Sequence, residues 1–345
     1  MNENWMHNRF RGFNLTDMLY TERSAYHTKQ TDEIFPEKDF KMISDWGFNF
    51  VRLPLSYRIW SSPDNPYLIN EEKLKNLDKA LEYANKYNLH TCICLHRIPG
   101  YCVNDDEPEK EPFNLWDDDE AKNAAKFQWG FLAERYKNIS TEKLSFNIVN
   151  EPHYSVASIR AAGVTDLLVG VIRDVSPERT VMIDGISNGD TPPIDSMFFK
   201  RDNCIYSCRG YKPTNITHFG VDWMKCKTPP GWPDSGAFTI GDTEIKYGVR
   251  EMEEYFAMWQ SIANAMKTRV FCGEFGCFKK TPHDVMLKWL EDLMIILKKY
   301  DIGYALWNFK SPNFGLVNNS RTDAPMKNVN GYSVDIDVLN ILQKY

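Results

Sequence analysis

The chain has 345 residues, of which 43% are hydrophobic, and its 47 acidic and 41 basic residues leave a net charge of −6. This composition is typical of a globular protein with a large apolar core. The acidic balance and the lack of a basic run argue against nucleic-acid binding. The sequence also has no run of about eighteen apolar residues, the length that crosses a membrane.

The first residues and the cysteines bear on where the protein works. Residues Met1 to Arg9 contain no apolar segment of the signal-peptide kind. The eight cysteines lie mostly inside apolar, strand-like runs, and no Cys/His spacing of a zinc site occurs. We therefore expect buried free thiols, no metal, no cofactor and a cytoplasmic protein. A secreted protein that has lost its export signal would show the same sequence, so this alternative stays open.

Short apolar runs alternate with longer helical patterns, which is typical of βα units and a parallel sheet. Strands are predicted, in chain order, at Arg11–Leu15, Phe48–Leu53, Thr91–Leu95, Leu144–Val149, Thr180–Ile183, Cys204–Ser207, Val270–Cys272 and Gly303–Leu306. Helices are predicted at Pro36–Trp46, Asn70–Tyr87, Asp117–Tyr136, Val164–Val175, Val249–Met266 and His283–Tyr300. The stretch Lys212–Tyr247, rich in Pro and Gly, is predicted to be a long irregular loop that carries Trp223 and Trp232.

Eight such units without a linker predict one α/β domain over residues 1–345, a (β/α)8 TIM barrel. A doubly wound sheet is disfavoured, because no glycine fingerprint of the nucleotide-binding kind follows the first strand.

Polar residues recur at the ends of the predicted strands, where a barrel of this class carries its active site. They are Arg52, His96, Arg97, Asn150, Glu151, Asp184, Arg209, Tyr211, Glu274 and Trp307. Glu151 and Glu274 end the fourth and seventh strands and would face each other across the barrel mouth. A carboxyl pair of this kind is what glycoside hydrolysis requires: one group protonates the leaving oxygen and the other attacks the anomeric carbon. A buried Glu in an ion pair with Arg is the structural alternative for either residue alone.

The strand-end motifs resemble glycoside hydrolase family 5 of clan A, the cellulase-like barrels, along nearly the whole chain. The matching segments include Arg11-Gly-Phe-Asn-Leu, Val51-Arg-Leu-Pro, Leu95-His-Arg-Ile-Pro-Gly-Tyr, Phe146-Asn-Ile-Val-Asn-Glu-Pro, Gly273-Glu-Phe-Gly and Leu306-Trp-Asn-Phe. The segment from Phe314 to Asp323 is also similar to the family's closing segment.

The resemblance implies a retaining β-glycosidase in which Glu151 is the acid/base and Glu274 is the nucleophile. It also implies that Asn150 binds the sugar 2-hydroxyl and that His96 binds another hydroxyl. Tyr211 would orient the nucleophile, and Trp307 would stack on the sugar. Arg52 is expected to hold Glu274 ionised through a charge-assisted hydrogen bond.

One position departs from the family pattern. The sixth strand normally ends in His-x-Tyr, but here Arg209 precedes Gly210 and Tyr211. A guanidinium cannot lose its charge, so we expect Arg209 to lie near Glu274 or to contact the substrate. Two other classes therefore stay open: a catalytically weakened barrel that binds carbohydrate, and a metal-assisted hydrolase, which the lack of a ligand cluster disfavours.

The expected partner is a carbohydrate, with a β-glucan or a gluco-oligosaccharide favoured by the likeness to cellulases. A mannan-specific or exo-acting glycosidase is the alternative. The long loop after the sixth strand could either close one end of the cleft or add aromatic platforms to an open groove.

Overall fold

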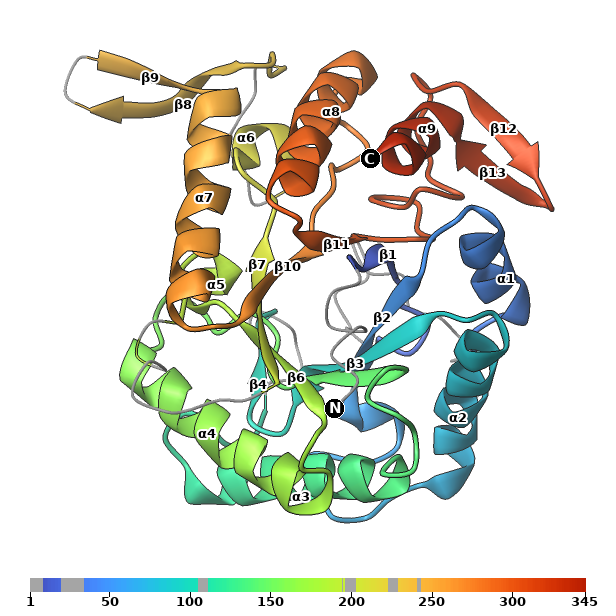
Figure 1. Cartoon of the computed structure of the whole chain (residues 1–345), viewed down its shortest axis with the longest axis vertical. Helices are drawn as coiled ribbons and strands as arrows, with labels where there is room; N and C mark the ends of the chain where they lie inside the picture. Colours follow the sequence, from blue (N-terminus) through green and yellow to red (C-terminus); the bar gives the residue numbers. More distant parts are fainter. Residues whose placement is uncertain are drawn as a thin grey trace.

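The computed structural model describes residues 9–19, 34–104, 111–193, 195, 203–222, 229–240 and 243–345. In this part of the chain, eight parallel strands close into a barrel with helices packed around its outside (Figure 1). The predicted (β/α)8 fold class is therefore confirmed.

The strands of the barrel are β1 (Arg11–Asn14), β2 (Phe50–Ser56), β3 (His90–Ile98), β5 (Leu144–Asn147), β6 (Thr180–Asp184), β7 (Cys204–Arg209), β10 (Arg269–Glu274) and β11 (Gly303–Leu306). Each strand pairs in parallel with the next one along the chain. The ring closes where β11 pairs with β1, with Gly12 opposite Ala305. All eight strands therefore point their carboxyl ends toward the same mouth.

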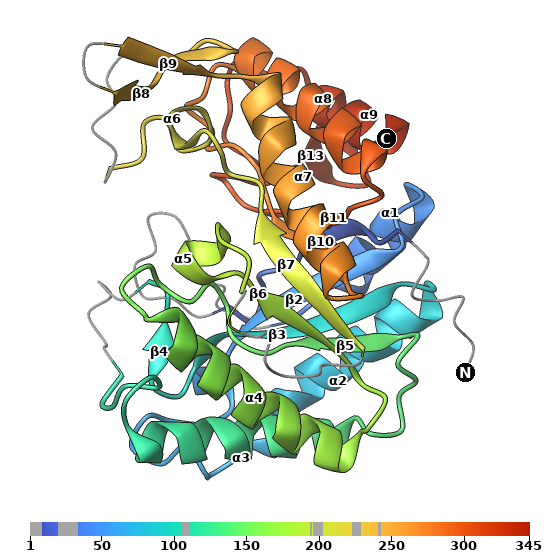
Figure 2. The same cartoon turned by 60° about the vertical axis from the view of Figure 1, so that its left-hand side comes forward.

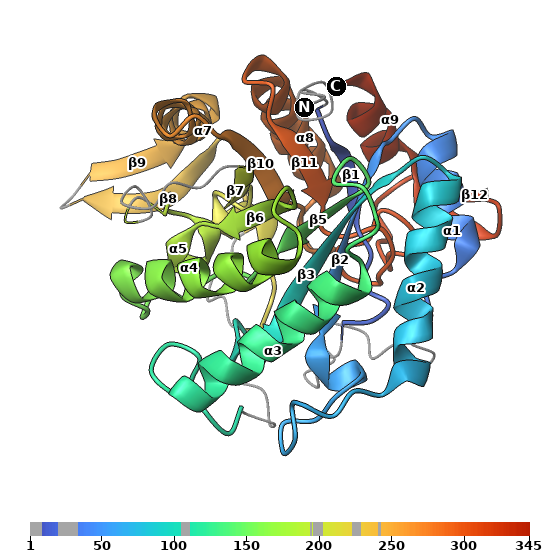
Figure 3. The ribbon, with the colours of Figure 1, turned by 60° about the horizontal axis from the view of Figure 1, so that its bottom comes forward.

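Helices form the outer layer (Figures 1 and 3). They are α1 (Glu37–Asp45), α2 (Glu71–Lys86), α3 (Asp119–Arg135), α4 (Ser158–Val175), α7 (Val249–Ala265), α8 (His283–Lys299) and α9 (Ile336–Lys344). Three short helical turns, η2 (Tyr57–Ile59), α5 (Ile186–Gly189) and α6 (Thr214–Thr217), follow β2, β6 and β7 at the barrel mouth.

Local sequence signals account for the helices, as α2 shows. The Asn70 side chain caps its first turn by accepting hydrogen bonds from the backbone N–H groups of Glu72 (3.1 Å) and Lys73 (3.3 Å). One face of the helix is apolar and buried, with Leu74, Leu77, Ala80, Leu81 and Ala84. The predicted stop after α1 is also present, because Gly47 adopts a φ of 84° just beyond the helix.

Several regions differ from the sequence-based prediction, among them the unpredicted helix α9 and the earlier start of α4 at Ser158. The stretch 212–247 is not irregular throughout, because β8 (Asp234–Ile240) and β9 (Thr243–Tyr247) form an antiparallel hairpin that projects from the barrel (Figure 2). Alternating β-branched and aromatic residues flank a Gly-Asp pair there, a hairpin signal that the surrounding Pro and Gly obscure. The short strand β4 (Tyr101–Cys102) and a C-terminal hairpin, β12 (Met326–Val329) with β13 (Tyr332–Asp335), were not predicted.

The tryptophans of that stretch were expected to lie near the cleft. The indole of Trp232 donates a hydrogen bond of 2.7 Å to Asp292 on α8 and packs against the core. Trp232 is therefore anchored to an outer helix, and it is not a free aromatic platform. Trp223 lies outside the described residues.

The barrel interior is layered. One small apolar cluster draws its fully buried side chains from barrel strands only: Phe50, Cys92, Met182, Ile205, Phe271 and Ala305. Two residues further along three of these strands lie Arg52, Cys94 and Asp184. Since side chains alternate along a strand, these residues face the same interior as the apolar cluster but lie nearer the mouth. The barrel interior is therefore apolar in the middle and carries charged residues near the mouth.

Two further sequence expectations concern the thiols and the helices. The seven cysteines in the described part of the chain are buried and free, as expected. No helix among the described residues has both the length and the apolar character needed to cross a bilayer.

Closure of the barrel requires a glycine in β1. A Cβ atom at Gly12 would lie 1.7 Å from the carbonyl oxygen of Phe50 on β2, and the backbone of β2 has little room to move. We expect Gly12→Ala to lower the free energy of unfolding by about 3 kcal/mol. Gly163→Ala on the exposed face of α4 is the matched control, because no atom lies within 4 Å of its added Cβ. The control should be neutral or stabilising by about 0.5–1 kcal/mol. Urea denaturation of both variants checks this, and equal stabilities would contradict it.

Candidate active site

Charged side chains from four barrel strands meet at the mouth. Arg52 comes from β2, Arg209 ends β7, Glu274 ends β10, and Glu151 follows β5. A continuous set of hydrogen bonds joins them. Residues far apart in the sequence are thus brought into one site, as the strand-end pattern predicts.

Glu274 is buried and held at both carboxylate oxygens. Nη1 of Arg52 donates to Oε1 over 2.7 Å, and the hydroxyl of Tyr211 donates to Oε2 over 3.2 Å. Nη2 of Arg209 lies 3.4 Å from the same Oε1. Two guanidinium groups therefore face this carboxylate, and the contact with Arg52 is the one expected from the sequence.

Glu151 occupies an unusual backbone position. Its φ is 46°, in the left-handed region that non-glycine residues rarely adopt, so this residue is strained. Its N–H donates to Oδ2 of Asp184 over 2.9 Å, and its carbonyl oxygen accepts from the hydroxyl of Tyr101 over 2.6 Å. These two bonds hold the strained peptide from both sides.

The carboxyl group of Glu151 is suited to carry a proton at neutral pH. Burial raises its pKa to about 8, the negative charge of Glu274 acts in the same direction, and the guanidinium of Arg209 opposes both. Nε of Arg209 donates a hydrogen bond to Oε1 of Glu151. The two carboxyl groups of the site therefore lie in different surroundings, which is how a pair divides into a proton donor and an anion.

Arg209 lies near Glu274, as the sequence predicts, but it also has two other anionic partners. Its charged hydrogen-bond partners are Glu151 and Asp184, while Glu274 is the more distant contact. Burial alone would raise the pKa of Asp184, but the charges of Arg209 and Arg52 hold that pKa below its usual value. Asp184 is therefore ionised beside Arg209.

Asn150 is fixed by both arginines. Its Oδ1 accepts from Nη2 of Arg52 over 2.7 Å and from Nη2 of Arg209 over 3.0 Å. Its buried Nδ2 has no acceptor among the described residues. The orientation set by the two guanidinium groups therefore leaves the amide NH2 group of Asn150 available for a ligand.

His96 and Trp307 form an aromatic wall. Their ring centroids lie 5.8 Å apart with an interplanar angle of 23°, so the rings are stacked. Nε2 of His96 lies 3.3 Å from Oδ1 of Asn104. The peptide bond between Trp307 and Asn308 is cis.

Several residues of the site were not singled out from the sequence. Asn14 at the end of β1 and Asn147 at the end of β5 both accept hydrogen bonds from Arg52, at 2.8 Å for Asn14 and at 2.8 and 3.0 Å for Asn147. Their position at strand ends could have identified them as site residues from the sequence. Tyr101, by contrast, lies on the unpredicted strand β4, and nothing in the sequence marks its contact with the Glu151 backbone.

A cleft of about 280 Å³ is lined by Tyr101, whose hydroxyl bonds to the backbone carbonyl of Glu151. Tyr101 and Trp116 line it with their rings in an edge-on contact of 4.9 Å, and Asn104 and His153 also border it. Nε1 of Trp116 is buried and has no acceptor among the described residues. The cleft therefore offers an apolar surface and a hydrogen-bond donor close to the backbone of Glu151.

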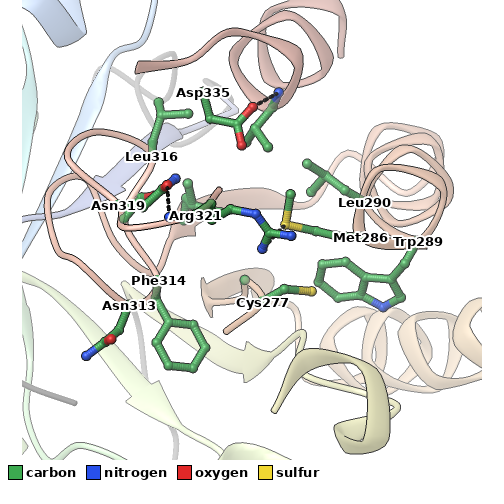
Figure 4. A pocket seen from close by; sticks show the side chains of 14 residues that line it. Cys277, Met286, Trp289, Leu290, Asn313, Phe314, Leu316, Asn319, Arg321 and Asp335 are labelled. Atoms are coloured by element: carbon green, nitrogen blue, oxygen red, sulfur yellow. Dashed lines mark hydrogen bonds between the residues drawn. The ribbon is translucent and has the colours of Figure 1, made fainter. Parts of the chain in front are cut away.

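A second hollow lies by the carboxyl ends of β10 and β11, between α8, the segment 313–321 and α9 (Figure 4). The side chain of Arg321 enters it and lies near Met286 and Trp289. Its volume of about 30 Å³ has room for only one or two water molecules. It is therefore a packing defect of the outer layer, too small for a sugar.

The described ranges contain no group of three or more His, Cys, Asp or Glu residues arranged to hold a metal ion.

Comparison with known proteins agrees with this geometry. The family described as cellulase (glycosyl hydrolase family 5) matches residues 9–313. Cellodextrinase A of Ruminococcus flavefaciens is 27% identical over 85% of this chain and 83% of its own length. Endoglucanase C of Acetivibrio thermocellus is 26% identical over 92% of this chain and 96% of its own.

Solved structures show the same fold. The crystal structure of a glycoside hydrolase superposes with a TM-score of 0.85 at 32% identity, covering 98% of this chain and 99% of that one. Thermotoga maritima Cel5A in complex with mannotriose superposes with a TM-score of 0.76 at 21% identity, covering 98% of each chain. From the family match and the shared barrel, we conclude that the chain belongs to glycosyl hydrolase family 5 and is a glycoside hydrolase.

Proposed function

We propose that Glu151 is the acid/base and Glu274 the nucleophile in the retaining hydrolysis of β-glucans or gluco-oligosaccharides. One observation carries this proposal: two carboxyl groups from strands on different sides of the barrel approach the same guanidinium, that of Arg209. Burial raises the pKa of Glu151 to about 8, while Arg52 donates a charged hydrogen bond to the carboxylate of Glu274. The pair thus has a proton donor and an anion in one site.

In the first step, the Glu274 carboxylate attacks the anomeric carbon while Glu151 gives its proton to the departing glycosidic oxygen. The bond from carbon to the leaving oxygen breaks, and an ester bond from carbon to Glu274 forms. Arg52 and Tyr211 orient the attacking carboxylate through their hydrogen bonds to its two oxygens.

In the second step, Glu151 has become a carboxylate and takes a proton from water. The resulting hydroxide equivalent attacks the anomeric carbon and displaces Glu274, which restores both groups to their starting states. Two displacements at the same carbon give net retention. Retention requires the carboxyl groups to lie about 5–5.5 Å apart.

The remaining site residues would bind the sugar. The free amide donor of Asn150 suits the 2-hydroxyl, where a hydrogen bond strengthens as positive charge develops on the ring. Trp307 would stack on the sugar ring, and His96, which stacks on Trp307, would bind a hydroxyl. The leaving part of the substrate would enter the cleft lined by Tyr101 and Trp116.

The choice of glucan rests on the relatives. An endoglucanase and a cellodextrinase each align with most of this chain at 26–27% identity. Both names denote action on glucose polymers or their fragments, so we propose the same substrate class here.

A substrate screen tests this proposal. Soluble β-glucans, mannan, xylan and chromogenic glycosides would be incubated with the enzyme, and products sized by chromatography. We expect β-glucan or gluco-oligosaccharide cleavage, with the first product formed as the β-anomer by proton NMR. Cleavage of mannan alone would overturn the substrate, an α-anomer would overturn retention, and saturable binding without turnover would mark a carbohydrate-binding protein.

Replacement of each carboxyl group should separate the two roles. Glu151→Ala should lower the rate on natural glycosides by about a hundredfold to ten-thousandfold, because the leaving oxygen loses its acid. It should spare the first step on an aryl glycoside whose leaving group needs no proton, and azide should restore turnover as a β-glycosyl azide. Glu274→Ala should be inactive on both substrates.

Glu120→Ala, an exposed substitution on α3, is the control for these measurements. Thermal melting of all three variants would show that they are folded. If Glu151→Ala were equally inactive on both substrates and azide had no effect, the assigned roles would be wrong.

The pH profile should report the proton on Glu151. Because its pKa is raised to about 8, the acid form is present at neutral pH and is lost as pH rises through that value. We expect kcat/KM on a glucan to fall above about pH 8. This decrease of kcat/KM at alkaline pH should be smaller for an aryl glycoside with a good leaving group, because that substrate needs no proton from Glu151. Identical alkaline limbs on both substrates would argue against Glu151 as the acid.

A further inference from the structure

The side chain of Arg209 has no N–H left for a substrate. A guanidinium group of arginine has five N–H donors. In this structure they meet five acceptors: Oε1 of Glu151, Oγ of Ser207, the carbonyl oxygen of Cys208, Oδ1 of Asn150 and Oδ2 of Asp184. The side chain is 1% exposed. Arg209 therefore acts on other protein groups, and a sugar could engage it only by breaking one of these bonds.

Asp184 is the partner that neutralises Arg209. Its side chain is fully buried, at 0% exposure. Oδ2 accepts from Arg209 and from the backbone N–H of Glu151, and Oδ1 accepts from Nδ2 of Asn147 over 2.9 Å. One carboxylate thus contacts both the cation beside the Glu151 carboxyl group and the strained backbone that carries it.

We propose that Asp184 and Arg209 form a charge-balanced pair of positioning residues that fixes Glu151 and sets how firmly it holds its proton. The inference rests on Glu151 being the acid, as proposed above. With Glu151 protonated, two buried cations, Arg52 and Arg209, face two buried anions, Asp184 and Glu274, and the cluster is neutral. A buried cation without its anion would instead draw Glu151 into the ionised form.

The charged groups that act on the Glu151 carboxyl group come from three strands, β6, β7 and β10, while Tyr101 on β4 bonds to its backbone and Arg52 on β2 bonds to the neighbouring Asn150. Arg209 on β7 bonds to its carboxyl group, and Glu274 on β10 repels its ionised form. Asp184 on β6 also repels that form, while the hydroxyl of Tyr211 bonds to Oε2 of Glu274. Loss of Asp184 removes a negative charge near Glu151, and loss of Arg209 removes a positive one. The two losses should therefore shift the pKa of Glu151 in opposite directions.

Two single variants and their combination test the pair. Asp184→Asn leaves Arg209 uncompensated, so we expect the alkaline limb of kcat/KM on a glucan to move down by about 1 pH unit. Arg209→Gln removes the cation and keeps the anion, so the limb should move up by a similar amount. The double variant is neutral again, and its limb should return to within about 0.3 pH unit of the wild-type position, even where kcat is reduced.

A purely structural role would lower kcat without moving the limb, or would move it in the same direction in both single variants. Either result overturns the proposal. Asp78→Asn is the matched control, because Asp78 also pairs with an arginine, Arg135, but does so between α2 and α3, away from the mouth. It should leave the limb where it is in the wild-type enzyme.

A readout independent of turnover completes the test. NMR titration of the intact enzyme with ¹³C-carboxyl-labelled glutamate follows Glu151 directly, with Glu151→Gln identifying its signal. Opposite displacements of this titration in the two single variants are expected, and coincident titrations overturn the proposal. If Asp184→Asn fails to fold, Arg209→Gln and Arg209→Lys decide: the first should move the titration and the second, which keeps the charge, should not.

Failure of the proposed function would look different. If Glu151→Gln cleaved glucans at the wild-type rate, Glu151 would not be the acid, whatever the two single variants did to its titration.

Discussion

Two buried guanidinium groups hold the mouth of this barrel together. Arg52 on β2 bonds to side chains of β1, β3, β5 and β10, namely Asn14, Cys94, Asn147 and Glu274. Arg209 on β7 reaches β6 and the segment after β5. Buried charges are costly unless their partners are in place, so each arginine stabilises the site only while its acceptors surround it. The contacts that orient the two carboxyl groups are therefore also the contacts that tie the strands to one another.

Because side chains alternate along a β-strand, this network lies directly above the small apolar cluster inside the barrel. Phe50 and Arg52, or Met182 and Asp184, are two residues apart and face the same interior. The lower residues pack against one another and exclude water. The upper residues then lie in a region of low polarisability, where charge interactions are strong and the pKa of Glu151 rises. The fold thus contributes to the chemistry through the dielectric environment as well as through geometry.

Much of this arrangement could be predicted from the sequence, because alternating apolar runs and strand-end polar residues are local signals. All eight strands, the cap at Asn70 and the convergence of Arg52, Glu151 and Glu274 follow from them. The partners of Arg209 could not be predicted, because they depend on how far a long side chain reaches across the mouth. The hairpin formed by β8 and β9 was missed for another reason, since its short alternating runs lie in a segment whose Pro and Gly content favours a loop. Tyr101 was missed because its role is a hydrogen bond to a backbone atom, which no side-chain pattern reveals.

Closure through β1 and β11 has a consequence for how the chain folds. β1 lies between β2 and β11, so until β11 has joined the sheet, β1 has a single neighbour and the ring stays open. Asn14, which bonds to Arg52 and to the backbone of Gly273 and Leu306, spans that seam. During synthesis, Arg52 on β2 cannot form all of its hydrogen bonds until the late strand β10, which carries Glu274, has been made. Such long-range pairing slows folding. A nascent chain that ends before β11 would leave the edges of β1 and β10 unpaired, and these edges are where a chaperone or a misfolded neighbour would bind.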